Sequence, residues 1–237
     1  MGLPAIAFTE HADFLDGGYP DFRELDVVAY LAEVERCRTL FPGLRILSGC
    51  ELGHPHRFPD RVAAVLAAGP IDRLLGSAHC VSWEGRFVDT SSAELLTPER
   101  AADVLRAYLA ELLDLVESAQ PFHALAHLDY PKRYWPHADL PYREEDYEEE
   151  IRAVLRATAA REAALELNTT RGAEPHRALC PGPVVLGWWA QEGGRAVTLG
   201  SDAHDPERIA RGFELAGQLA EAAGFRPNQD PAGCWRR

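Results

Sequence analysis

The feature that most constrains the fold of this 237-residue chain is a series of short apolar runs separated by amphipathic segments. The runs are continuous rather than alternating, which is typical of strands that are covered on both faces. Strands that alternate with helices in this way predict a parallel sheet within one α/β domain. Six strands are expected, at residues 5–9, 44–48, 74–77, 124–126, 164–167 and 196–199.

Amphipathic helices are predicted between these strands. Residues typical of helix boundaries mark their ends, such as Thr97-Pro98 at a start and Gly224 after a last turn. The predicted helices span residues 25–40, 58–68, from 97 onward, 144–161 and 205–223, and Trp188-Trp189 lies in a further one. Because no linker interrupts the pattern, we expect a single domain over residues 1–237. A barrel is favoured over an open doubly wound sheet, since the sequence has no G-x-G-x-x-G after a strand and no Walker lysine loop.

The composition excludes several classes of function. The chain has 37 acidic and 24 basic side chains, a formal net charge of −13, which disfavours nucleic acid as a partner. No apolar run is long enough to span a membrane and no signal peptide is evident, so we expect a cytoplasmic protein without a membrane partner. The five cysteines are scattered without a C-x-x-C pair, which argues against a disulfide framework and a thiolate zinc site.

Polar side chains able to bind metal follow the predicted strands. The strand ends read FTEH, GCELG, GSAH, LAHLD, ELNTT and GSDAH. In a parallel barrel these ends meet on one face, where the active site forms. The predicted ligands are six nitrogen or oxygen donors: His11, Glu51, His79, His127, Asp202 and His204. Such a set suits zinc, manganese or iron, and because it exceeds what one tetrahedral ion needs, two to three divalent ions are expected.

Further polar residues lie close to these ligands along the chain. Asp129 and Asn168 could orient the metal-binding histidines or cap loops. Lys132, Arg133 and Arg171 follow two ligand strands and are predicted to bind an anionic substrate, the alternative being solvated surface residues. Ordinary structural roles are expected for the other histidines, and Trp83, Tyr134 and Trp135 are expected in loops on the same face. These other histidines are His54, His56, His123, His137 and His176.

From Pro4 to about Phe225 the sequence resembles the PHP (polymerase and histidinol phosphatase) metallo-phosphoesterases. The resemblance rests on FTEH, GCELG, GSAH, LAHLDYPKRY, LELNTTRG and TLGSDAH, and the long LAHLDYPKRY stretch favours the histidinol-phosphatase branch. It implies a distorted seven-stranded β/α barrel, similar to a TIM barrel. It further implies that Glu51 bridges two metals, with Asp202 on the first and both His79 and His127 on the second. His11 and His204 would then bind a third ion.

The sequence departs from the family pattern at its start. The family begins with a strand that ends in H-x-H, usually D-x-H-x-H, and this sequence has none. It begins where the second family strand is expected, so we expect the first strand to be missing and the domain to be N-terminally incomplete. The first metal would lack two ligands and the third would lack one. We therefore expect the functional gene product to begin about 10 to 20 residues earlier.

The expected activity is hydrolysis of a small phosphate monoester. The resemblance implies L-histidinol phosphate, which would give L-histidinol and phosphate in histidine biosynthesis. A water shared by two metal ions can lose its proton near neutral pH, so Glu51 and Asp202 are predicted to be catalytic through the metals that they hold. The alternatives are a phosphoesterase acting on nucleotides or other sugar phosphates, and an inactive, metal-poor binding or regulatory relative. The oligomeric state and the metal identity are left open.

Overall fold

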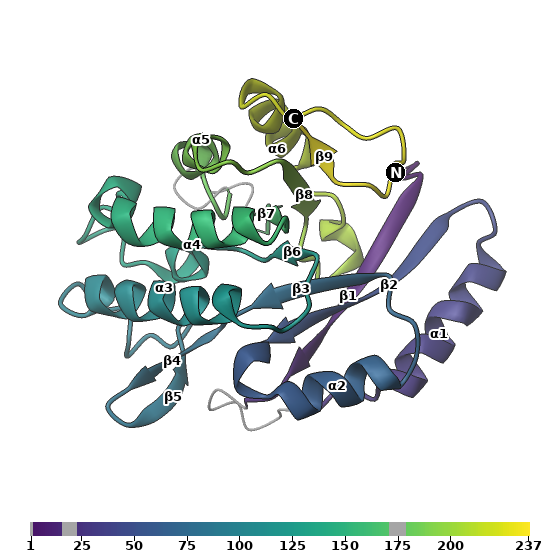
Figure 1. Ribbon diagram of the computed structural model, residues 1–237, viewed down its shortest axis with the longest axis horizontal. Helices are drawn as coiled ribbons and strands as arrows, with labels where there is room; N and C mark the ends of the chain where they lie inside the picture. Colours follow the sequence, from purple (N-terminus) through teal and green to yellow (C-terminus); the bar gives the residue numbers. More distant parts are fainter. Residues whose placement is uncertain (1, 16–22, 171–178) are drawn as a thin grey trace.

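A curled seven-stranded sheet forms the centre of the computed structural model, with helices packed around it (Figure 1). The structure describes residues 2–15, 23–170 and 179–237. The strand order is β1-β2-β3-β6-β7-β8-β9. The strands are β1 (Ala5–Asp13), β2 (Arg45–Gly53), β3 (Arg73–Ser77), β6 (Ala124–Leu125), β7 (Ala164–Asn168), β8 (Ala196–Gly200) and β9 (Trp235–Arg236).

All six predicted strands are present, and neighbours among them pair in parallel, which confirms the expected parallel sheet. Their carboxyl ends therefore lie along one edge. β1 and β2 run four and five residues further than predicted, and their register places His11 opposite Glu51. Two predicted ligands are thus neighbours inside the sheet. In the described part of the chain, β1 pairs with β2 alone and forms one edge of the sheet.

The helices before β8 lie where the sequence predicts them, although α1 and α2 begin one or two residues later than predicted and α3 and α4 begin four residues later. The helices are α1 (Val27–Leu40), α2 (Pro59–Ala67), α3 (Ala101–Glu117), α4 (Glu148–Ala160), α5 (Pro183–Gln191) and α6 (Phe213–Ala222). Short 3₁₀ helices are η1 (Pro55–Arg57), η2 (Tyr130–Tyr134), η3 (Glu144–Tyr147) and η4 (Pro206–Arg208). No helix in the described ranges is long and apolar enough to cross a membrane.

The prediction of one continuous helix over 205–223 is wrong. Ala210 and Gly212 adopt left-handed backbone angles, with φ of 58° and 79°. Left-handed residues cannot continue a right-handed helix, so η4 ends before them and α6 begins at Phe213. The Thr169 hydroxyl donates a hydrogen bond to the Arg211 carbonyl and fastens this break to the end of β7.

Two short antiparallel elements were not predicted. A hairpin of β4 (Cys80–Trp83) and β5 (Arg86–Asp89) directly follows His79, and Glu84 and Gly85 form its turn with positive φ, as tight hairpin turns require. Trp83 therefore lies in a strand, which corrects its expected place in a loop. β9 pairs antiparallel with the start of β8 and adds the seventh strand.

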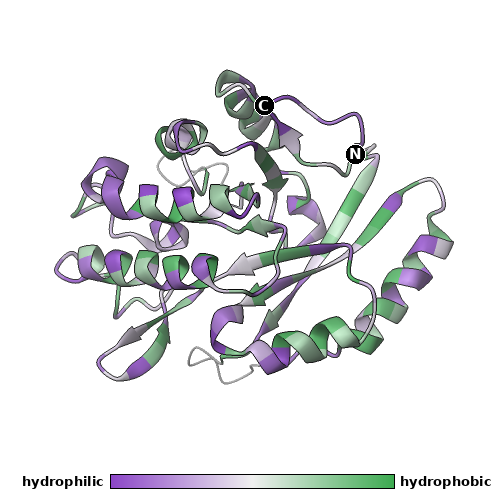
Figure 2. Cartoon of the chain, in the orientation of Figure 1, coloured by the Kyte–Doolittle hydropathy of each residue, from purple (hydrophilic) through white to green (hydrophobic). Residues whose placement is uncertain are grey.

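The apolar stripe of α3 packs against the sheet and confirms the helical periodicity. Leu105, Leu109 and Leu112 on this helix are fully buried, and Leu125 and Leu165 of the adjoining strands join the same core. Figure 2 shows the apolar strands and the two-sided colouring of the helices that cover them. Because protein cores are close-packed, this arrangement holds the strand ends in fixed relative positions.

Candidate metal centre

Four imidazoles form a row along the carboxyl edge of the sheet. His11 lies in β1, His79 and His127 follow β3 and β6, and His204 follows β8. In the order His204, His11, His79, His127, consecutive ring centroids are 5.6, 5.4 and 5.1 Å apart. The predicted convergence of the strand ends is therefore observed for all four histidines.

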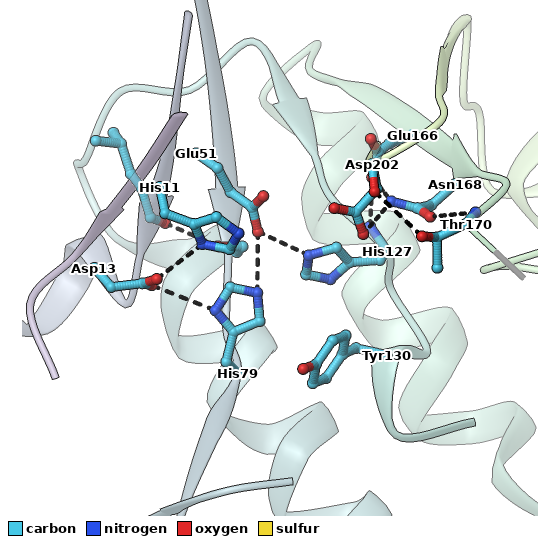
Figure 3. Close-up of polar contacts among 12 residues, drawn as sticks. His11, Asp13, Glu51, His79, His127, Tyr130, Glu166, Asn168, Thr170 and Asp202 are labelled. Carbon is cyan, nitrogen blue, oxygen red and sulfur yellow. Dashed lines mark hydrogen bonds and ion pairs between the residues drawn. The ribbon is translucent and has the colours of Figure 1, made fainter. Parts of the chain in front are cut away.

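The Glu51 carboxylate lies among the imidazoles of His11, His79 and His127 (Figure 3). It is 5% exposed, and its Oε1 lies 2.8 Å from His127 Nε2 and 3.0 Å from His79 Nε2. One carboxylate oxygen thus contacts two imidazole nitrogens that come from different strands. Glu51, His79 and His127 form a group of donor atoms that all lie within 4.8 Å of one another.

Asp13 joins the centre, although sequence reasoning did not select it. Its Oδ2 lies 2.8 Å from His11 Nδ1 and its Oδ1 lies 3.3 Å from His79 Nδ1. Asp13 stands two residues after His11 in β1, and residues at this spacing share one side of a strand. A Cβ at Gly53, its register partner in β2, would overlap the Asp13 carboxylate, so this glycine makes room for it.

A third group of donors consists of His11, Asp202 and His204. Asp202 follows β8 with a left-handed φ of 47°, and His204 Nδ1 lies 3.1 Å from the Asp202 carbonyl oxygen. Arg133 Nη1 donates to Asp202 Oδ2 over 2.8 Å. The Arg133 guanidinium also stacks over the Tyr130 ring, 5.0 Å from its centroid. This arginine is 4% exposed, and its Nε and Nη2 have no hydrogen-bond partner among the described residues.

Glu166 and Asn168 connect the segment that carries His127 to the segment that carries Asp202. Glu166 is buried and accepts hydrogen bonds from the His127 backbone N–H (3.0 Å) and the Asn168 amide (3.2 Å). The same Asn168 amide lies 3.3 Å from Asp202 Oδ2, so its contact is with a carboxylate, and the role predicted for it in orienting the histidines stays a prediction. Sequence reasoning left Glu166 without a role. The sequence signal was a carboxylate inside an apolar strand. In the structure, Gly200 of the neighbouring strand β8 makes room for it, because a Cβ at Gly200 would overlap the Glu166 carboxylate.

The remaining predicted site residues are placed differently. The Lys132 ammonium contacts Glu144 Oε1 (3.1 Å) and the Leu179 carbonyl (3.2 Å) and lies 3.5 Å from Asp129 Oδ2. Lys132 and Asp129 are therefore engaged with each other in the interior. The substrate contact predicted for Lys132 and the orienting role predicted for Asp129 stay predictions. Arg171 lies outside the described residues.

The charges of the centre compensate one another. The negative charge of Glu51 raises the pKa of His11 to about 9. Burial alone would lower the pKa of His79, but the hydrogen bonds and charges of Asp13 and Glu51 raise it well above its ordinary value. Burial would likewise raise the pKa of Glu51, yet the imidazoles around it hold that pKa well below its usual range. In the metal-free protein, protons on His11 and His79 therefore balance the carboxylates, whereas burial lowers the pKa of His127.

The donor set fits divalent cations. Three overlapping groups, Glu51–His79–His127, His11–Asp13–His79 and His11–Asp202–His204, each bring their donor atoms within 4.8 Å of one another. All donors are imidazole nitrogens or carboxylate oxygens, the ligands that zinc, manganese and iron accept. All six predicted ligands lie in these groups. A cation entering a group would take the place of imidazole protons, because a nitrogen that binds metal must be deprotonated.

A curled α/β half-barrel with such donors at its strand ends defines a class of metal-binding barrel proteins. The family model described as the PHP domain matches residues 1–170. The chain therefore belongs to the PHP domain family.

Known proteins similar to the chain extend this result. The histidinol-phosphatase of Lactococcus lactis is 30% identical over 225 residues, which cover 94% of this chain and 81% of that protein. A crystal structure of histidinol phosphate phosphatase from that organism, complexed with zinc, L-histidinol and phosphate, has a TM-score of 0.77 at 28% identity. It covers 95% of this chain and 84% of its own. A structure from Listeria monocytogenes, 18% identical with a TM-score of 0.74 over 89% and 88% of the two chains, shares the fold. The expected histidinol-phosphatase branch is thus confirmed.

We predict that Glu166 makes the metal-free protein less stable as the pH rises. Burial, with the charges of Asp202 and Glu51, raises the pKa of Glu166 from 4.5 to about 7. Between these values the folded chain keeps a proton that the unfolded chain loses, so the free energy of unfolding falls as pH increases through this window. Glu166→Gln should remove this slope. Relative to the variant, the wild type should lose about 2 to 3 kcal/mol between pH 4.5 and 7.5.

Urea unfolding of both proteins after chelation, followed by circular dichroism across this pH range, measures the effect. Glu117→Gln, at an exposed position on α3, is the matched control and should follow the wild type. Parallel stability curves for the wild type and Glu166→Gln would contradict the assignment.

Proposed function

We propose that this chain is a metal-dependent phosphatase that hydrolyses L-histidinol phosphate to L-histidinol and inorganic phosphate. We further propose that it uses two to three divalent ions, with zinc, manganese and iron as the candidates. The observation that carries the proposal is the set of three overlapping donor groups at the carboxyl edge of a PHP fold. The relatives support the substrate, since the similar L. lactis structure is complexed with zinc, L-histidinol and phosphate.

The proposed ligands form two donor groups, one at each end of the metal centre. Glu51, His79 and His127 would hold an ion at one end, and His11, Asp202 and His204 would hold one at the other. Divalent ions placed there polarise phosphoryl oxygens and lower the pKa of a bound water. Glu51 is suited to contact more than one ion, because its Oε1 already faces two imidazoles and its register partner is His11.

Arg133 supplies the chain's own positive charge beside the centre. Asp202 and Tyr130 fix its guanidinium, and its Nε and Nη2 donors lack partners among the described residues. A buried donor without a partner is costly, and a phosphoryl oxygen would satisfy it through a charge-assisted hydrogen bond. We propose that Arg133 holds the phosphate of the substrate. This local charge, together with the metals, would offset the net charge of −13.

Phosphate release by the metal-loaded protein tests the function directly. L-Histidinol phosphate should be hydrolysed with a higher kcat/KM than nucleotides or other sugar phosphates, and activity should disappear after chelation and return with zinc or manganese. A preference for nucleotides or sugar phosphates would replace the proposed substrate. A protein that binds metal and releases no phosphate from any ester would contradict the enzyme.

Glu51→Gln and Asp202→Asn should each lower kcat/KM by at least about 100-fold, because each change removes a carboxylate charge from the proposed metal ligands. Metal content should fall with activity, while circular dichroism stays close to that of the wild type. Asp139→Asn, at an exposed position, is the control and should keep full activity. Near-normal turnover with a full metal content in Glu51→Gln would refute this ligand assignment.

Arg133→Ala should reduce kcat/KM about tenfold or more for L-histidinol phosphate and by a similar factor for a small aryl phosphate, because the phosphoryl group that Arg133 is proposed to hold is common to both esters. Arg133→Lys should recover little of the loss, because lysine keeps the charge but not the planar fork. Steady-state kinetics on both esters, with the exposed Arg86→Ala as control, gives the comparison. Unchanged kcat/KM on both esters would contradict the proposed phosphate contact, and a loss confined to L-histidinol phosphate would assign Arg133 to the leaving group instead.

A further inference from the structure

A second cluster of charged and imidazole groups lies next to the backbone of His79, outside the metal centre, with His54 and Glu111 buried and Arg57 exposed. It consists of His54, His56, Arg57 and Glu111, and is called here the His54 cluster. Glu111 comes from α3, while the other three lie at and after the end of β2. Glu111 Oε1 lies 2.9 Å from His54 Nδ1 and 2.9 Å from His56 Nε2, and Arg57 donates two hydrogen bonds to the Glu111 carboxylate.

The hydrogen bonds of His54 define its tautomer. Its Nε2 accepts hydrogen bonds from the backbone N–H groups of His79 (3.1 Å) and Cys80 (3.0 Å). A ring nitrogen that accepts must present its lone pair, so the proton of the neutral ring is on Nδ1, where it is donated to Glu111. His54 Nδ1 is then not available to a cation, and Arg57 already neutralises Glu111. The cluster therefore has a different task from the metal centre, although it contains the same residue types.

The backbone around His79 is fixed from both sides by these contacts. The His79 N–H is held by His54, and the His79 carbonyl accepts from the Thr90 backbone N–H (2.8 Å) and hydroxyl (3.0 Å). The His54 N–H in turn donates to the Ser77 carbonyl over 2.8 Å. The ring of His79 points the other way, toward Glu51 and Asp13 (Figure 3).

We infer that His54 is a positioning residue for His79. Glu111 and Arg57 hold the His54 ring, and His54 fixes the peptide groups that aim the His79 imidazole at Glu51. This inference rests on the proposed function only in that His79 binds a metal. The backbone of His54 is left-handed, with φ of 53°, a strained conformation that persists when surrounding contacts over-determine it.

The test compares His54→Asn with His54→Gln, which carry the same amide on side chains that differ by one methylene. The Gln carbonyl can reach the place of Nε2 and accept from His79 and Cys80, whereas the Asn carbonyl is too short. Asn tolerates left-handed backbone angles better than most residues do. Backbone strain alone would therefore favour His54→Asn over His54→Gln, which is the opposite of the expected result. Zinc affinity of the metal-free protein, measured by chelator competition, should fall about 10- to 100-fold in His54→Asn and less than about threefold in His54→Gln.

A double-mutant cycle identifies His79 as the residue through which the effect acts. In a His79→Ala background, His54→Asn should cause no further loss of zinc affinity, because no imidazole is left to position. His56→Gln is the matched control, since His56 lies as close to Glu111 as His54 does but is not among the groups that bond the His79 backbone. Its zinc affinity should stay within about twofold of the wild type, even if its melting temperature falls.

Variants of Glu111 give the same test if His54→Asn does not fold. Glu111→Gln keeps a carbonyl that accepts from His54 Nδ1 and should keep zinc affinity, whereas Glu111→Leu should lose it.

Zinc affinity in His54→Asn equal to that of the wild type, an equal loss in His54→Gln, or additive losses with His79→Ala would each overturn the inference. A wild type that binds zinc but does not hydrolyse L-histidinol phosphate would refute the proposed substrate and leave this inference standing. A wild type that binds no zinc would overturn the inference itself.

Discussion

The metal centre depends on the contact of the buried Glu51 carboxylate with the imidazoles of His79 and His127. Burying a charge is costly unless the charge is paired, and these partners come from different strands. The pairing therefore forms only when β2, β3 and β6 lie in their observed register. β1 adds His11 opposite Glu51, and Asp13 then reaches both His11 and His79. The sheet order and the electrostatics of the centre thus depend on one another.

Two histidine clusters of similar composition differ because of their charge partners. Glu111 in the His54 cluster receives both hydrogen bonds of an arginine fork, so its charge is already neutralised. The described contacts of Glu51 are with imidazoles, whose protons a metal ion can replace. The residue types in the sequence do not separate the two clusters. The residue that distinguishes them is Arg57, and arginine is a residue type that usually lies on the surface without such a role.

Much of the fold could be predicted because the parallel strands β2, β3, β6 and β7, which are buried along nearly their whole length, read as continuous apolar runs. The polar residues that follow these strands then mark the edge of the sheet at which the proposed site lies. The ends of β1 and β2 were predicted too early, because His11, Asp13 and Glu51 are polar residues inside strands and break the apolar signal. Asp13 was missed for this reason. β4, β5 and β9 are too short to show a periodicity.

The environment of single polar side chains could not be predicted, because it depends on partners distant in the sequence. Arg133 is buried through its contact with Asp202, and Lys132, its neighbour, is directed to Glu144 instead. Glu166 lies in a strand that was predicted correctly, but its contact with the backbone of His127 follows only from the pairing of β6 with β7.

Anomalous diffraction at the zinc absorption edge, from crystals of the zinc-loaded protein, tests the central claim most directly. The account predicts a zinc peak bounded by Glu51, His79 and His127 at about 2.0 to 2.2 Å from their donor atoms, with no zinc among His54, His56 and Glu111. Zinc bound in the His54 cluster, with Glu51 still contacting only the imidazoles of His79 and His127, would contradict it.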